Sequence, residues 1–364
     1  MSSRVEYIDI ARGIGIALVV IGHNQVCDEG GMLYSLIFCF HMPLFFFISG
    51  CFHRTKKSLV TEIISRGKRL LLPYYVTAFA FILFKTCMNP AGFYHNELRP
   101  ILFGVLWGSG GTGSTERYLF WPPLWFLTAM FVTQVAYSII LRIGLFEKSM
   151  LSRVSLYTLV LIFGYFYLES NGSGYVNVFG AKMILSENGY PFNVDLVPVT
   201  IFFYWIGAEV NQIIKLPNII NSVRVCGGVL MFSVIIFIAI HWWMYCRGNI
   251  GVGMDLNLRR YGHFFVTTVL AIVGILNVLV LSLIIDIKIR GSFVCLLKIL
   301  GRYSLSILVF HYFIQKQAAE ILQNYNLWPI GYALGLVAPI LIARFIISRN
   351  RILYSIYGGV PVAR

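Results

Sequence analysis

Long apolar segments alternate with short polar ones along most of this chain. Ten of them approach the roughly 20 residues that an α-helix needs to cross the hydrocarbon core of a membrane. We therefore predict an all-α polytopic membrane protein of about ten transmembrane helices, forming one domain over residues 1–364 without an additional soluble domain. The predicted helices lie at about 6–26, 33–52, 69–88, 124–145, 152–169, 195–215, 223–245, 263–285, 299–321 and 330–348.

The composition supports a membrane protein. Hydrophobic residues make up 58% of the chain and charged residues only 12%, with a mean hydropathy of +0.77. A soluble core could not absorb that much apolar surface. The formal net charge of +14 raises the question of nucleic-acid binding, but the basic residues are scattered between hydrophobic segments and form no soluble basic module. We therefore expect no nucleic-acid partner.

The distribution of Lys and Arg predicts the topology. When the N-terminus is placed in the cytoplasm, most of the 29 Lys and Arg residues fall in cytoplasmic segments, as the positive-inside rule requires. Both termini are then cytoplasmic. One predicted external loop disagrees, because it carries Arg247, Arg259 and Arg260. Two explanations stay open: these arginines bind an anionic ligand, or a span is misplaced.

The seven cysteines predict neither a disulfide framework nor a metal site. Their number is odd, they show no CxxC spacing, and most lie within apolar segments. We expect them to be small interior residues. The predicted topology places Cys27 and Cys246 in external loops and permits a disulfide between them, although the support for it is weak.

The first predicted helix contains two ionisable residues, Arg12 and His23, in an otherwise apolar segment. At about 100° per residue, their spacing places both on one helix face, about 16 Å apart along the axis, with Ile16 and Val19 between them. An ionisable residue in a membrane segment usually faces a protein interior or a water-filled cavity. One end of this helix can therefore hold an anion while the other handles a proton.

A simpler interpretation gives Arg12 and His23 no chemical role. Arg12 then extends to the cytoplasmic surface, and His23 caps the far end of the helix. In either case the segment is retained rather than cleaved as a signal peptide, because Asp9 and Arg12 interrupt the apolar run and no A-x-A site follows.

The second predicted helix contains the motif FHMPLFFFISG. Pro43 removes a backbone hydrogen bond and is expected to kink the helix, whereas Ser49 and Gly50 allow close packing near its end. His41 fits an interior histidine with satisfied hydrogen bonds better than a catalytic residue.

The most basic part of the chain, HRTKKSLVTEIISRGKRLLLPYY, runs into the third predicted helix. Arg66 and Arg69 are three residues apart and therefore neighbours on one helix face. Two guanidinium groups so placed can bind phosphate oxygens through paired hydrogen bonds, and Lys56, Lys57 and Lys68 add positive charge. Positive-inside anchoring explains the same residues and is favoured by the sequence alone.

Two predicted external loops are long enough to cover a site that opens outward. They span 89–123 and 170–194, and loops of this length are more often functional than idle. The glycine-rich WGSGGTGS in the first is not a phosphate loop, because no GK[ST] follows. Trp125, just after it, suits a membrane interface.

The later helices contribute three more ionisable residues. Asp195 and Glu209 lie at opposite ends of the sixth predicted helix. His311 lies at a depth in the ninth helix comparable to that of His23 in the first. The two imidazoles therefore meet if these helices are neighbours.

Five motifs follow one another in a specific order. They are Arg-x10-His preceded by an acid (Asp9, Arg12, His23), FHMPLFFFISG, Arg-x-x-Arg (Arg66, Arg69), PPLWFL and GRYSLSILVFH. In this order they resemble the bacterial integral-membrane acyltransferase family 3, which acylates surface polysaccharides and other envelope acceptors. The resemblance implies about ten helices in the bacterial inner membrane. It also implies transfer of an acyl group, usually acetyl, from cytoplasmic acyl-coenzyme A to a sugar hydroxyl.

The resemblance assigns roles to four residues. His23 is implied to be catalytic, and Arg12, Arg66 and Arg69 are implied to handle the donor. The acceptor would be a lipid-linked or polymeric glycan. Candidates for supporting roles lie in or near the same segments: Asp9, His41, Ser49, Tyr74, Trp125, Glu209 and His311.

The chemistry of a thioester donor is compatible with these residues. Coenzyme A carries several phosphate charges, so its binding requires cations at the cytoplasmic face and a reaction centre deeper in the membrane. Transfer to an alcohol needs a base or a covalent carrier and an oxyanion donor, but neither a metal nor a bound cofactor. We favour His23 as the base, while an acyl-imidazole intermediate stays open. Ser49 and Tyr74 are guesses for the oxyanion donor.

Two functions from other classes compete with acyl transfer. A transporter or flippase of an envelope glycan or its precursor would line its path with the same charged residues, but the sequence shows no convincing inverted repeat. A structural or sensory membrane protein leaves unexplained why Arg12 and His23 share one helix face.

Overall fold

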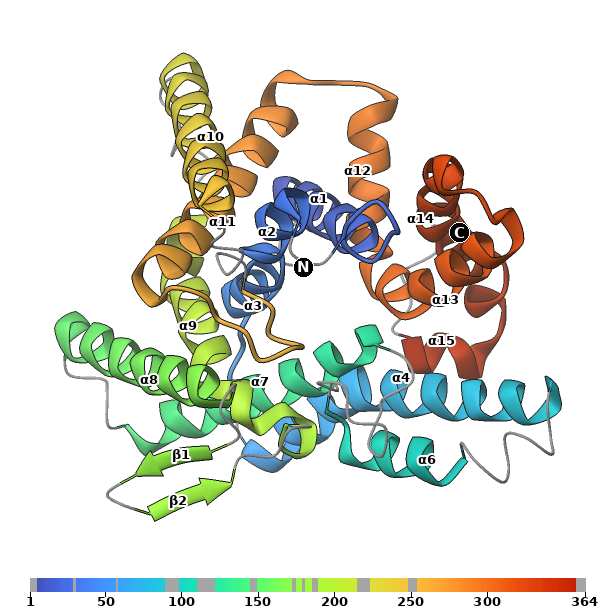
Figure 1. The fold of residues 1–364 in the computed structure, drawn as a ribbon, viewed down its shortest axis with the longest axis horizontal. Helices are drawn as coiled ribbons and strands as arrows, with labels where there is room; N and C mark the ends of the chain where they lie inside the picture. Colours follow the sequence, from blue (N-terminus) through green and yellow to red (C-terminus); the bar gives the residue numbers. More distant parts are fainter. Residues whose placement is uncertain are drawn as a thin grey trace.

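The computed structural model describes residues 5–28, 31–56, 58–88, 98–109, 122–144, 149–171, 175–178, 181–184, 189–214, 223–247 and 254–357. In these ranges the regular structure is helical apart from one short antiparallel hairpin, in which β1 (Tyr175–Val178) pairs with β2 (Ala181–Ile184). Figure 1 shows the N-terminal helices at the centre of the molecule and the later ones around them.

The α-helices in chain order are α1 (Glu6–Gly22), α2 (Met32–Phe38), α3 (His41–Cys51), α4 (Leu59–Met88), α6 (Leu98–Trp107), α7 (Trp125–Ile143), α8 (Met150–Asn171), α9 (Val197–Ile214), α10 (Val223–Cys246), α11 (Phe264–Lys288), α12 (Ser292–Arg302), α13 (Ser304–Leu322), α14 (Trp328–Phe345) and α15 (Arg351–Tyr357). Short 3-10 turns cover η2 (Pro122–Leu124), η3 (Pro191–Leu196), η5 (Tyr325–Leu327) and η6 (Ile347–Arg349).

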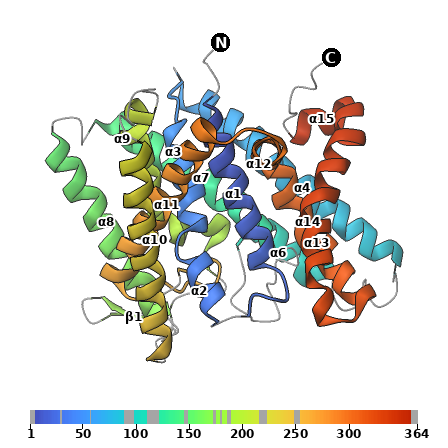
Figure 2. The same ribbon diagram turned by 90° about the horizontal axis from the view of Figure 1, so that it is seen from above.

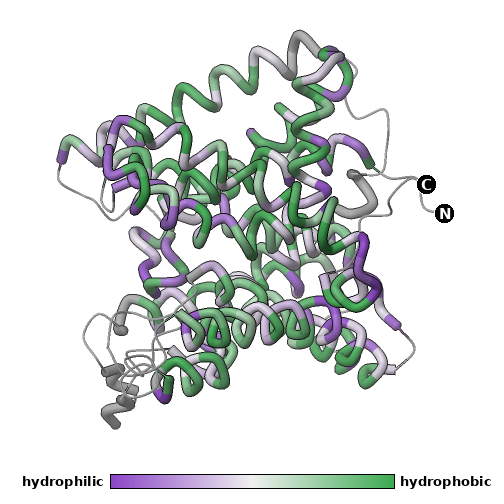
Figure 3. The backbone as a smooth tube through the Cα atoms, turned by 90° about the vertical axis from the view of Figure 1, so that its right-hand side faces the viewer, coloured by the Kyte–Doolittle hydropathy of each residue, from purple (hydrophilic) through white to green (hydrophobic). Residues whose placement is uncertain are grey.

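The all-α polytopic architecture is confirmed. Among the described residues, eight helical segments are long and apolar enough to cross a membrane when α2 and α3 count as one segment (Met32–Cys51), and a ninth span results if the bent pair α12–α13 counts as one. The predicted number of about ten also includes α1, whose 17 residues are at the lower limit for a membrane span. Figure 3 shows apolar positions dominating the helices and polar positions concentrated at their ends and in the connections.

Three helix boundaries differ from the prediction. The second predicted helix is broken at Cys39 and Phe40 into α2 and α3, so Pro43 lies in the first turn of α3 and does not kink a continuous helix. A proline there loses no hydrogen bond that the helix needs. The third helix begins at Leu59, ten residues earlier than predicted, because its basic first turns are helical as well. The ninth bends by 86° between α12 and α13, at Tyr303.

Glycine allows two pairs of helices to touch through their backbones. A Cβ atom on Gly13 of α1 would overlap the carbonyl oxygen of Leu297, and one on Gly301 of α12 would overlap that of Asp9. A similar reciprocal contact joins α3 and α9. Such close approach is how helices associate inside a membrane, where the hydrophobic effect between them is absent. These crossings fix α1, which carries Asp9 and Arg12 and is followed directly by His23, and α3, which carries His41 and Ser49.

Replacing Gly301 with valine is expected to prevent normal folding. The new side chain would meet the backbone of α1, which cannot move aside as a side chain can, so the cost should reach or exceed the ~1–3 kcal/mol typical of overpacking. Gly228→Val on α10 is the matched control, because a Cβ there meets nothing within 4 Å. Thermal unfolding of the detergent-solubilised variants measures both effects. A Gly301→Val protein as heat-stable as the control would contradict the role of this crossing.

The ends of the described chain agree with the predicted topology. Figure 2 shows the start of α1 and the helix α15 on the same side of the molecule. Their location in the cytoplasm stays a prediction. The disulfide that the topology permits does not form, because Cys27 is a buried free thiol and Cys246 an exposed one.

The predicted external loop that departs from the positive-inside rule contains arginines with different contacts. Arg259 is buried, and its Nε lies 3.0 Å from Oδ2 of Asp195, at the start of the sixth predicted helix. The guanidinium also donates to Ser109 Oγ at 2.7 Å and to Asn193 Oδ1 at 2.9 Å. The explanation that this arginine serves an anionic ligand is therefore wrong, since its charge is used to join loops. Arg247 instead lies over the ring of Trp243, 4.4 Å from its centroid.

Candidate active site

Two cavities enter the bundle near α1 and α3. The first, which we call the arginine cavity, measures about 460 Å³ and is lined by Arg12, Arg69 and other cations. The second, the histidine cavity, measures about 760 Å³ and is lined by His23, His41 and Trp125 among others. The candidate residues of the first helix are thus divided between two cavities.

The arginine cavity is strongly basic. Among the described residues that line it, Glu62 is the only carboxylate. A cavity with such an excess of positive charge attracts anions, above all phosphates. Its cations are Arg12, Arg54, Lys56, Arg66, Arg69 and Arg302.

The face predicted for the first helix is confirmed for Arg12, Ile16 and Val19, whereas His23 directly follows the last residue of α1. Arg12, Ile16 and Val19 all line the arginine cavity, and His23 at the end of α1 lines the histidine cavity. The Arg12 side chain is 29% exposed, with Nη1 3.9 Å from Oδ1 of the buried Asp9. Its guanidinium lies 5.2 Å from the centre of the Phe52 ring. This arginine faces a cavity of the protein.

Arg66 and Arg69 line the same cavity but differ in their exposure and in their ion pairing. Arg69 is exposed and makes no ion pair with any described residue. Arg66 forms an ion pair with Glu62 and donates to Gln134 Oε1 at 2.9 Å. The shared helix face is therefore confirmed, but Glu62 already neutralises much of the charge of Arg66.

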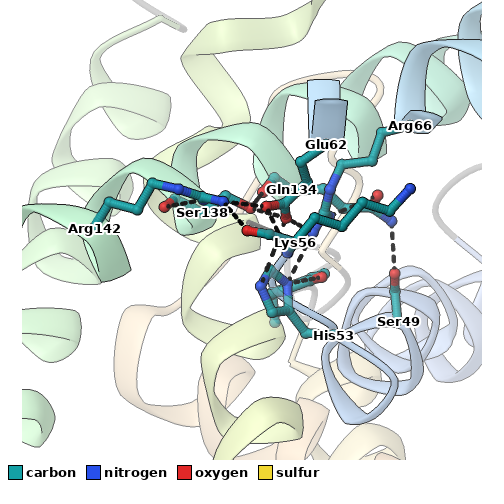
Figure 4. Close-up of polar contacts among 9 residues, drawn as sticks. Ser49, His53, Lys56, Glu62, Arg66, Gln134, Ser138 and Arg142 are labelled. Carbon is teal, nitrogen blue, oxygen red and sulfur yellow. Dashed lines mark hydrogen bonds and ion pairs between the residues drawn. The ribbon is translucent and has the colours of Figure 1, made fainter. Parts of the chain in front are cut away.

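Glu62 is the centre of a polar cluster that sequence analysis missed. It is 1% exposed, and Figure 4 shows Arg66 and Arg142 approaching it from opposite sides. Its Oε2 lies 2.7 Å from Nη2 of Arg142, and Ser138 Oγ donates to Oε1 at 2.6 Å. These contacts tie the start of α4 to α7. A single acid within the most basic stretch of the chain was the signal that could have revealed it.

His53 completes this cluster. Its Nδ1 lies 2.8 Å from the Tyr204 hydroxyl and 3.3 Å from Nη2 of Arg66. Burial, and to a smaller extent the charges of Arg66 and Arg142, lower the pKa of His53 to about 4, although Glu62 acts in the opposite direction. The imidazole is therefore neutral at pH 7 and adds no charge to the arginine cavity.

The predicted meeting of two imidazoles is confirmed, although only His23 of the pair lines the histidine cavity. The ring centroids of His23 and His311 are 5.5 Å apart. Asn24 holds the end of α1 against α13, because its Nδ2 donates to Gln315 Oε1 at 2.7 Å. Gln315 Nε2 in turn donates to the Val20 carbonyl at 2.9 Å.

His311 presents a defined tautomer. Its Nδ1 lies 2.7 Å from the Ile307 carbonyl and 3.0 Å from the Leu308 carbonyl, and since carbonyls only accept, Nδ1 carries the proton. Nε2 then carries a lone pair. This atom is buried and has no hydrogen-bond partner among the described residues. The ring next to His23 therefore keeps one unpaired acceptor nitrogen.

His41 fits the interior interpretation and still borders the cavity. It is 2% exposed, and Nδ1 donates to the Ile37 carbonyl at 2.8 Å. Its ring packs edge-on against Phe38, with centroids 4.7 Å apart. Trp125 lines the same cavity, as does Tyr312, whose ring is 5.7 Å from that of His23.

Three predicted supporting residues lie away from His23. The Tyr74 hydroxyl donates to the Val105 carbonyl at 2.8 Å, and this residue lines neither cavity. Ser49 lines the arginine cavity and accepts a hydrogen bond from Gln134. Glu209 lies 2.8 Å from Nε of Arg153 and also lines neither cavity. The structure therefore brings neither guessed oxyanion donor to the histidines.

The predicted lids lie only partly within the described residues. The first loop, 89–123, includes the helix α6, while the second, 170–194, includes the hairpin and η3. Lys57 is also outside the described residues. Among those that are described, no group of three or more His, Cys, Asp or Glu side chains is arranged to hold a metal ion.

Comparison with known proteins gave one match. A family model described as an acyltransferase domain matches residues 5–349, nearly the whole chain. No curated protein matches, and no solved structure does.

Proposed function

The chain belongs to acyltransferase family 3, and from this premise we propose that it transfers an acyl group, most often acetyl from acetyl-CoA, to a hydroxyl of a cell-envelope glycan. The protein would act in the bacterial inner membrane. The observation that carries the proposal is the division of the α1 face between two cavities, with Arg12 in the basic one and His23 in the other.

The arginine cavity is the proposed donor site. The positive-inside rule puts its cations at the cytoplasmic face, where acyl-CoA is available. We assign the phosphates to Arg69, which makes no ion pair with a described residue, and to Arg12, which lies 3.9 Å from Asp9, whereas Arg66 is held closely by Glu62. Arg66 then holds the cavity wall in place.

The histidine cavity is the proposed acceptor site. Its lining combines aromatic rings, Trp125 and Tyr34, with the polar side chains of Asp255, Gln25 and Lys316. Aromatic surfaces with a few placed polar groups suit a sugar, which has apolar ring faces and hydroxyl edges. Such a site would bring an acceptor hydroxyl to His23.

The proposed reaction balances without a metal or a bound cofactor. His23 takes the proton of the glycan hydroxyl, and the oxygen attacks the thioester carbon. A C–O bond forms and the C–S bond breaks. The departing thiolate takes the proton back from His23, which gives an acylated glycan and free coenzyme A. In the covalent variant, His23 itself carries the acyl group between the two substrates.

His311 is proposed to position His23. The unpaired Nε2 of His311 is an acceptor for an N–H of the protonated His23 ring, 5.5 Å away between centroids. Catalytic hydrogen bonds are often long before the substrates bind and shorten in the complex. This role resembles that of a carboxylate behind a catalytic histidine, with a neutral acceptor in its place.

Incubating membranes with radiolabelled acetyl-CoA tests the proposal. We expect label in an envelope glycan and release of an equal amount of free thiol. A transporter or flippase would produce neither, and a structural or sensory protein would also leave the thioester intact. Mass spectrometry of envelope glycans with and without the gene then identifies acyl group and acceptor together. Absence of thiol release from membranes containing the folded protein would contradict the proposal.

Arg69→Gln is expected to raise the KM for acetyl-CoA about five- to tenfold, with little change in kcat, because an exposed charge-assisted hydrogen bond to phosphate is lost. Lys68→Gln is the matched control, since it removes a positive charge one residue away that does not line the arginine cavity. Steady-state kinetics with solubilised protein measure both. Equal effects of the two substitutions would show that only the general positive field matters.

A further inference from the structure

The two cavities meet at Met42. Of the described residues, this one alone lines both of them, and its side chain is nearly buried, with 7% exposed. We propose that Met42 is the gate between donor and acceptor sites, whose side chain must turn aside before the thioester can reach His23. The proposal rests on the proposed function, and it adds a residue that sets which acyl groups can cross.

The partition between the cavities is one side chain thick. On α1, Val19 lines the arginine cavity and Gly22 the histidine cavity, a separation of about 4.5 Å along the helix. On α13, Leu308 and Tyr312 divide in the same way, about 6 Å apart. A single side chain at that level is enough to close the passage.

Met42 is the part of this partition that can move at low cost. Methionine is unbranched and has three rotatable side-chain bonds, so it changes rotamer more readily than the branched or aromatic residues beside it. The surrounding groups include Phe126 on α7 and Leu308 on α13. Met42 also lies in the first turn of α3, directly after the break that separates α2 from α3.

The proposed donor site and the proposed base lie at different cavities, so the reaction requires a passage between them. The cations that suit the coenzyme A phosphates lie in the arginine cavity, whereas the imidazoles of His23 and His41 lie in the histidine cavity. The acyl end of the donor must therefore pass the level of Met42 to react. A closed gate keeps a thioester in the donor site away from water that enters through the acceptor site.

The gate also predicts selectivity for short acyl groups. The opening left by one displaced methionine side chain is narrow, so each additional methylene on the acyl group meets the aromatic and branched side chains around it. One methylene is worth about 10-fold or more in discrimination when a site is closely fitted. Acetyl should therefore pass far more easily than butyryl.

Two substitutions at Met42 test the gate in opposite directions. Met42→Ala should widen the passage, lowering the preference for acetyl-CoA over butyryl-CoA by about tenfold or more and raising hydrolysis of acetyl-CoA in the absence of acceptor. Met42→Trp should block it, reducing transfer by about 100-fold while the KM for acetyl-CoA stays within about threefold of the wild-type value. Met42→Leu, which conserves volume, should keep acetyl selectivity.

Leu44→Ala is the matched control for lost packing. Leu44 lies on the same helix, is completely buried and lines neither cavity. Its truncation should lower thermal stability and leave the acetyl-to-butyryl ratio unchanged. If Met42→Trp does not fold, the Met42→Ala ratio alone decides.

The outcomes of these experiments distinguish a failure of the proposed gate from a failure of the proposed function. If the wild-type protein releases no thiol from acetyl-CoA, the proposed function fails and the gate with it. If wild-type transfer is normal but folded Met42→Ala keeps the wild-type acetyl-to-butyryl ratio, only the gate is overturned. Normal transfer by folded Met42→Trp would overturn it as well.

Discussion

Replacing His23 with glutamine is expected to lower the rate of acyl transfer by about a thousandfold, within the range assigned to general-base catalysis. Glutamine keeps a similar size and hydrogen-bonding capacity but cannot take a proton at pH 7 or carry an acyl group. Because His23 caps α1 from a partly buried position, the fold should survive the change. Thiol release and glycan labelling, measured on protein of confirmed thermal stability, report the effect.

His41→Gln is the control for this prediction. His41 lines the same cavity, but its Nδ1 is used in a hydrogen bond to the Ile37 carbonyl, so its loss should lower stability more than the rate of the chemical step. If the His23→Gln protein transfers acyl groups within about tenfold of the wild-type rate, His23 is neither base nor covalent carrier. A larger loss in the His41 variant than in the His23 variant, at equal stability, would move the catalytic role to His41.

Helical periodicity was sufficient to predict the face of α1. The positions of Arg12, Ile16 and Val19 follow from about 100° per residue, and all three line one cavity. The contact between His23 and His311 could be predicted only on the condition that their helices are neighbours. Matching depths in two helices are readable from the sequence, but which helices are neighbours depends on packing between distant segments.

The helix breaks could not be predicted from hydropathy. A window that averages apolar residues registers 33–52 as one segment, although the backbone leaves the helical conformation at Phe40, between α2 and α3. The 86° bend at Tyr303 was missed for the same reason, since both of its sides are apolar. Yet the first break places Met42 at the start of a helix between the two cavities, so the missed feature bears directly on the proposed mechanism.

Counting charges along the sequence also failed to identify an ion pair whose two residues are far apart in the chain. Arg259 was counted as a topological anomaly, but its partner Asp195 is 64 residues away and both are buried. Glu62 was overlooked because one acidic residue among many basic ones changes the net charge of the segment very little. In the structure this acid forms ion pairs with Arg66 and Arg142 at the arginine cavity.

Glu62→Ala is accordingly expected to destabilise the protein by about 3–5 kcal/mol, the typical cost of leaving buried charges without their partner. Arg66 and Arg142 would both lose the carboxylate that holds them, and the link between α4 and α7 would weaken. A marked fall in the thermal unfolding temperature of the solubilised protein would report this loss.

The same substitution should act on donor binding in the opposite direction. Removing the only described carboxylate of the arginine cavity releases the charge of Arg66, so the fraction that remains folded should bind coenzyme A as tightly as the wild type or more tightly. Adding Arg142→Gln to Glu62→Ala removes one of the two orphaned cations and should restore part of the stability. An unchanged unfolding temperature for Glu62→Ala would show that Glu62 does not hold the cavity wall, and weaker coenzyme A binding would mean that Arg66 needs this carboxylate to stay in place. At Glu62 we therefore predict that the stability of the protein falls while its affinity for coenzyme A is kept or rises, although this residue lies away from the proposed base, His23.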